Sequence, residues 1–174
     1  MAPVLNTARR HADTAPVEEP HGRAGLAAEL DALLGAGEGR PAVIWLDLDR
    51  FADVNAALGR AAGDELLGVV AKRLQAAVRE GDLVTRVGAN AFVVVCPRIA
   101  TAAEAVRAGI RMGETVGRQI QLKETRTRSR ASVGVAWCPE HDTDGAGLLR
   151  RAEQAMRRAR QGGGHRPVLA TGPD

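Results

Sequence analysis

Residues Arg86-Val-Gly-Ala-Asn-Ala-Phe92 decide the class of fold, because an apolar segment stands on each side of a short glycine-containing turn. The apolar run continues through 93–96. Such a pattern is typical of two antiparallel strands joined as a β-hairpin. We therefore expect strands over 83–87 and 91–96. The turn between them carries no acidic side chain, so the hairpin itself brings no carboxylate to a ligand.

Helical and strand-like periodicities continue outward from the hairpin on both sides. In chain order, the spacing predicts a helix over 24–34, a strand over 41–48, helices over 50–58 and 61–79, the two hairpin strands, a helix over 101–117, a strand pair over 118–123 and 128–137, a helix over 146–161 and an edge strand at 168–169. This order predicts an α/β fold, an α+β sandwich in which helices surround a mixed central sheet of about five strands.

The 174 residues are enough for one domain with its own core, which we place at 23–170. Residues 1–22 lack periodicity and are expected to form a disordered arm, and 171–174 a tail. The start of the chain lacks the apolar core of a signal peptide, and no run is long enough to span a bilayer. We therefore expect a cytoplasmic protein that does not enter a membrane.

Composition argues against two further classes of site. The net charge is +3, but aromatic residues make up only 2%, so stacking on single-stranded nucleic acid is not expected. Cys96 and Cys138 do not have the spacing of metal ligands, and neither His141 nor His165 has a metal-binding partner nearby in sequence. Buried, reduced thiols are the expectation for the two cysteines.

Several short motifs stand in a fixed order between about 40 and 169. In chain order they are Asp47-Leu-Asp49-Arg-Phe51, Asn55, Gly59, Gly63-Asp64, Arg79-x-x-Asp82, Arg86-x-Gly88-x-x-x-Phe92, Ser132-Val-Gly134-Val-Ala136 and Leu148-Leu-Arg150-Arg-Ala152-Glu-x-Ala155-Met156. Together they resemble the GGDEF domain of diguanylate cyclases, bacterial signalling enzymes that make cyclic di-GMP from two GTP molecules. The resemblance implies a nucleotide-cyclase-like fold and two domains that face each other, so we expect a homodimer or a protein partner.

The chain departs from the family at the positions that serve catalysis. Two divalent metals act in the family, and the resemblance places one ligand at Asp47 and the second at Asn90, where the family has an acid. Ala89 stands in place of the second glycine of the signature, and Ala91 in place of another acid. A site for hard cations needs anionic oxygens. The departures therefore imply that cyclase activity is lost and that no cofactor is required, with Mg²⁺ entering only if GTP still binds.

Basic residues that meet the triphosphate in the family are altered as well. Ala52 replaces a lysine, Gly164 replaces an arginine, and Arg160 stands in place of a second lysine.

Asp47 and Asp49 follow a strand, where sites in α/β proteins usually lie, but both can equally be remnants of ancestry.

Two binding features of the family survive. The resemblance implies that Asn55 and Asp64 read a guanine edge, whereas the alternative is that Asn55 faces solvent and Asp64 caps a helix. Arg79 and Asp82 correspond to the product-inhibition site of active cyclases. The arginine side chain can donate two hydrogen bonds to guanine, at O6 and N7, and a carboxylate can accept from the guanine ring N–H. The alternative for this pair is an ordinary helix end followed by a turn.

A second arginine often completes such a site, and Arg107 and Arg111 are the candidates. The sequence thus predicts an inactive GGDEF-like domain that acts as a receptor for cyclic di-GMP or as a regulatory module. A ligand-free interaction or dimerisation module, a weak GTP- or GDP-binding domain and a residually active cyclase are the alternatives.

Three alternating arginines, Arg126, Arg128 and Arg130, are expected on one face of a strand, either as an anion-binding patch or as a charged edge.

Overall fold

The computed structural model describes residues 22–37, 40–123, 125–138, 144–164 and 166–170. The expected tail, His141, His165 and all of the expected arm except Gly22 lie outside the described residues. None of the helices within these ranges is both long enough and apolar enough to cross a membrane.

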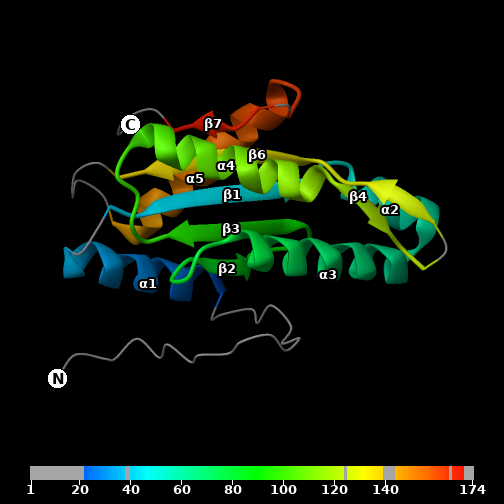
Figure 1. Ribbon diagram of the computed structural model, residues 1–174, viewed down its shortest axis with the longest axis horizontal. Helices are drawn as coiled ribbons and strands as arrows, with labels where there is room; N and C mark the ends of the chain where they lie inside the picture. Colours follow the sequence, from blue (N-terminus) through cyan, green and yellow to red (C-terminus); the bar gives the residue numbers. More distant parts are fainter. Residues whose placement is uncertain (1–21, 38–39, 124, 139–143, 165, 171–174) are drawn as a thin grey trace.

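A mixed sheet forms the centre of the domain (Figure 1). Within the described residues it has five strands, which are β1 (Ala42–Leu48), β2 (Leu83–Arg86), β3 (Ala91–Cys96), β6 (Ala131–Trp137) and β7 (Val168–Leu169). Their order is β2-β3-β1-β6-β7, so β1 lies in the middle and pairs antiparallel with β3 and with β6. The expected hairpin is β2 and β3, and β7 is the expected edge strand, parallel to β6. The predicted fold class is confirmed.

Helices cover both faces of the sheet. Their bounds are α1 (Gly22–Ala36), α2 (Phe51–Leu58), α3 (Arg60–Ala77), α4 (Ala102–Gly117) and α5 (Gly145–Gln161). Buried residues of α3 and α4 form one core with Ile44 and Leu46, and buried residues of α1 and α5 form another with Val43 and Trp45. Successive residues of a strand point to opposite faces, so the centre strands read as continuous apolar runs because both faces are buried.

The α5 backbone lies directly against β6 at Gly134. A Cβ atom at this position would come within 2.1 Å of the Met156 amide nitrogen and 2.2 Å of the Ala152 carbonyl oxygen. Only glycine permits so close an approach. The glycine of the Ser132-Val-Gly134 motif therefore sets the distance between α5 and the sheet.

The start of α5 is tied to α1. A Cβ on Gly145 would meet the Ala27 carbonyl oxygen at 2.2 Å, and the Gly145 amide donates to Asp31 Oδ1 at 2.6 Å. Further along, Arg23 pairs with Glu153 of α5 and lies over the Trp45 ring, 4.9 Å from its centroid. These contacts fix α1 on the sheet face that α5 covers.

Strands lie within both ranges of the expected strand pair, 118–123 and 128–137, but the prediction that they pair with each other is wrong. A separate small sheet joins β4 (Gln119–Gln121) to β5 (Arg126–Arg128), and β6 begins only at Ala131. The apolar strand β6 pairs with β1 in the centre of the main sheet. The polar segment before it, β5, is mostly exposed and pairs with β4. Because β5 ends at Arg128, Arg130 does not share a strand with the other two arginines, and the expected three-arginine face is not formed.

Candidate functional site

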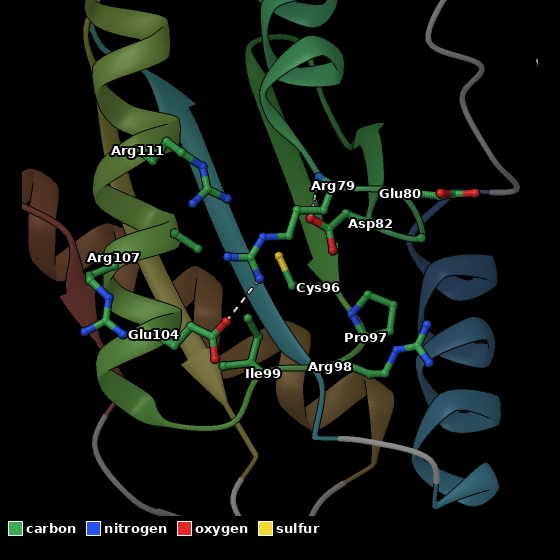
Figure 2. A pocket seen from close by; sticks show the side chains of 12 residues that line it. Arg79, Glu80, Asp82, Cys96, Pro97, Arg98, Ile99, Glu104, Arg107 and Arg111 are labelled. Carbon is green, nitrogen blue, oxygen red and sulfur yellow. Dashed lines mark hydrogen bonds and ion pairs between the residues drawn. The ribbon is translucent and has the colours of Figure 1, made fainter. Parts of the chain in front are cut away.

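A pocket of about 370 Å³ lies between the turn that follows α3, the end of β3 and the first half of α4 (Figure 2). All four residues predicted for the product-inhibition site line it, namely Arg79, Asp82, Arg107 and Arg111. Figure 2 shows the Arg79 side chain reaching from the turn toward α4, where Arg111 and Glu104 lie on either side of its guanidinium. The structure thus brings together four residues that are spread along the sequence from Arg79 to Arg111.

The turn that carries Arg79 and Asp82 is closed by its own hydrogen bonds. The Arg79 amide donates to Asp82 Oδ2 at 3.0 Å, and the Asp82 amide donates to the Arg79 carbonyl at 3.1 Å. Gly81 between them has φ 90°, a left-handed conformation that favours glycine. Asp82 is therefore a turn residue, as the ordinary interpretation predicts, but its carboxylate also faces the pocket.

Cys96 lies beside Asp82 among the residues that line the pocket. Burial first, and the neighbouring Asp82 second, raise the pKa of the Cys96 thiol to about 12. The thiol therefore stays protonated at neutral pH and presents an S–H group to the carboxylate. Both cysteines are buried, which matches the burial expected from the sequence.

Glu104 is a site residue that the sequence analysis missed. Its Oε1 accepts from Arg79 Nη1 at 3.1 Å, and its Oε2 accepts from the Ala100 amide at 3.0 Å. The Glu104 amide donates to Thr101 Oγ1 at 3.1 Å, so Thr101 is the N-cap of α4, and the Thr101-x-x-Glu104 sequence has the capping-box pattern although Glu104 bonds to the amide one residue before the N-cap. The Ala100 amide and the Arg79 guanidinium hold the pKa of Glu104 below its usual value. The capping-box pattern was the signal in the sequence that would have located this carboxylate.

A second polar cluster lies at the end of β1. Asn90 Nδ2 donates to Asp47 Oδ1 at 2.6 Å and to the Leu48 carbonyl at 3.0 Å. Arg160, at the end of α5, pairs with the same Asp47 oxygen, and its Nε lies 3.8 Å from Asp49 Oδ1. Burial raises the pKa of Asp47, while Arg160 and Asn90 act in the opposite direction. The sequence placed Arg160 as a phosphate contact, but the structure pairs it with the carboxylate.

The predicted guanine-reading residues lie on adjacent helices, Asn55 on α2 and Asp64 on α3. A Cβ on Gly63 would lie 1.8 Å from Asn55 Oδ1, so this glycine leaves room for the Asn55 side chain against α3. Asn55 Oδ1 is buried and has no hydrogen-bond partner among the described residues, which argues against the solvent-facing alternative. Asp64 lies inside α3 and the N-cap is Gly59, so the capping alternative for Asp64 is wrong.

Comparison with known proteins identifies the same family that the sequence motifs resemble. The family described as "Diguanylate cyclase, GGDEF domain" matches residues 21–166. Diguanylate cyclase TpbB of Pseudomonas aeruginosa is 39% identical over 128 residues, which are 72% of this chain and 29% of TpbB. The chain therefore spans less than a third of that relative.

Solved structures share the fold. The crystal structure of the GGDEF domain of PA1120 (YfiN or TpbB) from Pseudomonas aeruginosa has a TM-score of 0.81 and 31% identity, and covers 87% of this chain and 97% of its own. The GGDEF domain of DgcB from Caulobacter crescentus, solved in complex with c-di-GMP, has a TM-score of 0.79 over 94% of this chain and 96% of its own. Its identity is 23%, so the likeness concerns the fold.

Proposed function

The chain belongs to the GGDEF family of diguanylate cyclase domains, and we propose that it is a catalytically inactive member that acts as a receptor for cyclic di-GMP. The observation that carries the proposal is the pocket in which Arg79, Asp82, Arg107 and Arg111 meet. It lies away from the altered signature turn, so binding there does not depend on the residues that the chain has lost.

The chemistry of this pocket suits a dianionic guanine dinucleotide. A guanidinium can donate a bidentate pair of hydrogen bonds to guanine O6 and N7, and a carboxylate can accept from the guanine ring N–H groups. Asp82 is held in place by the Arg79 amide, so the acceptor is oriented before the ligand arrives. Arg107 and Arg111 add the positive charge that two phosphodiester groups require.

Arg79→Ala is expected to weaken binding of cyclic di-GMP by at least about thirtyfold, the scale at which truncation of an anchoring arginine usually falls. Isothermal titration calorimetry of wild type and variant measures this. Arg150→Ala is the matched control, because Arg150 is exposed on α5, outside the pocket, and its loss removes the same charge. Absence of binding by the wild type, or equal affinity in both arginine variants, would end the proposal.

Glu104→Gln is expected to tighten binding by about two- to fivefold, because the wild-type carboxylate competes with the ligand for Arg79. The range is that of exposed ion pairs. Glutamine keeps an acceptor for the Ala100 amide, so the α4 cap is retained. Glu80→Gln removes an exposed charge from the same pocket without breaking a described ion pair, and serves as the control. Weaker binding by Glu104→Gln would instead place Glu104 among the groups that accept from the ligand.

A second candidate function is weak binding of GTP or GDP between α2 and α3. It is favoured by Asn55 Oδ1, a buried acceptor that has no hydrogen-bond partner among the described residues. The two sites are separable. A thermal-shift series with cyclic di-GMP, GTP and GDP distinguishes them, since Arg79→Ala removes only the first shift and Asn55→Ala only the others. If no nucleotide raises the midpoint, a ligand-free interaction or dimerisation module is the function that remains.

A further inference from the structure

The end of β1 holds a positive charge of its own. In the family, divalent cations neutralise the carboxylate that corresponds to Asp47. We propose that Arg160 is a built-in cation that takes the place of these metals, so that the domain binds neither Mg²⁺ nor Mn²⁺ at Asp47. The inference rests on family membership and is independent of cyclic di-GMP binding.

The charge balance of the cluster supports this assignment. The Asp47 side chain is only 15% exposed, and a carboxylate at such depth needs a partner. Arg160 contacts Asp47 through Nη2 and lies near Asp49 through Nε, so one planar guanidinium serves both carboxylates. The cluster therefore carries its own countercharge.

The remaining polar atoms are also donors where a metal would need acceptors. Asn90 presents its NH₂ group to Asp47 Oδ1, the oxygen that Arg160 also contacts. Ser132 Oγ donates to Asp49 Oδ1 at 2.7 Å. A divalent cation on these oxygens would face a guanidinium and an amide N–H at close range. Across the described part of the chain, no group of three or more acidic, histidine or cysteine side chains is arranged to hold a metal ion.

The chain that follows α5 holds Arg160 in this position. The Gly163 amide donates to the Arg160 carbonyl at 3.1 Å, and the Gly164 amide donates to the Ala159 carbonyl at 2.8 Å. Both glycines have positive φ, 95° and 72°. A Cβ on Gly164 would approach Asp49 Oδ2 at 3.1 Å and Ser132 Oγ at 3.0 Å. The glycine run thus ends the helix tightly and brings its last turn against the two carboxylates.

Titration with Mn²⁺, followed by the electron paramagnetic resonance signal of the free ion, tests the assignment. Wild type is expected to leave the free-ion signal unchanged. The double variant Arg160→Gln/Asn90→Asp removes the cation and supplies a second carboxylate, so it is expected to reduce the free-ion signal and to show a rise in melting temperature with Mn²⁺.

Two controls make the outcome decisive. Arg158→Gln removes an exposed charge from the same end of α5 and is expected to leave Mn²⁺ unbound. Asp47→Asn added to the double variant is expected to abolish the gained binding. Mn²⁺ binding by wild type that Asp47→Asn removes would overturn the proposal. A double variant that folds, as judged by circular dichroism, but binds no Mn²⁺ would equally overturn the assignment of the exclusion to Arg160 and Asn90.

Discussion

Gly134→Ala is expected to leave little or no folded protein. The added Cβ would lie 2.1 Å from the Met156 amide nitrogen, 2.2 Å from the Ala152 carbonyl oxygen and 2.7 Å from Met156 Cα. All three are backbone atoms of α5, so no side-chain rotation relieves the overlap. Gly134 itself lies in β6 opposite Trp45 of β1, at the centre of the sheet.

The helix must therefore move away from the sheet, and the core between them opens. Ordinary overpacking costs about 1–3 kcal/mol. Separating two packed backbones costs more, and a loss above about 4 kcal/mol approaches the whole stability of a small domain. Urea denaturation followed by circular dichroism measures the free energy of unfolding.

Gly68→Ala is the matched control for this prediction. Gly68 is an exposed residue within α3, and a Cβ there meets nothing within 4 Å. Alanine is the better helix former, so this variant is expected to gain about 1 kcal/mol of stability. An unfolding midpoint for Gly134→Ala equal to that of wild type would contradict the close contact between α5 and β6.

Purified protein with GTP and Mg²⁺ or Mn²⁺ is expected to yield no cyclic di-GMP. The family's mechanism requires two metals held by carboxylates, which stabilise charge on the reacting phosphate. Here Asn90 donates to Asp47, and Arg160 neutralises it. Losing about 4 kcal/mol of transition-state stabilisation already lowers the rate about a thousandfold. Chromatography of the nucleotide products, with a GGDEF domain of intact signature as positive control, measures the rate.

Asn90→Asp alone is expected not to restore activity, because Arg160 still occupies the Asp47 carboxylate. Product formed by the wild type would refute the inactive assignment, while leaving the pocket around Arg79 open to test by binding.

Much of the fold could be predicted because its signals are local. The apolar run 93–96 and the spacing of Leu148, Leu149 and Met156 locate β3 and α5 from neighbouring residues alone. The strand expected at 128–137 was located, but it begins at Ala131 and its expected pairing with the strand in 118–123 was wrong. A strand's partner is chosen by burial in the sheet, which periodicity within one segment does not encode.

By itself, the sequence determined the element types, the motif order that places the chain in its family, and the absence of acids at Asn90 and Ala91. These depend on residue identity and on short spacings. Only the tertiary structure decided which charges meet. Arg160 reaches Asp47 from 113 residues away, and Glu104 reaches Arg79 from 25 away. Such pairs exist because α5 rests on the sheet at Gly134 and because α4 begins beside the turn after α3. The geometry of these pairs follows from tertiary packing, which depends on contacts throughout the domain.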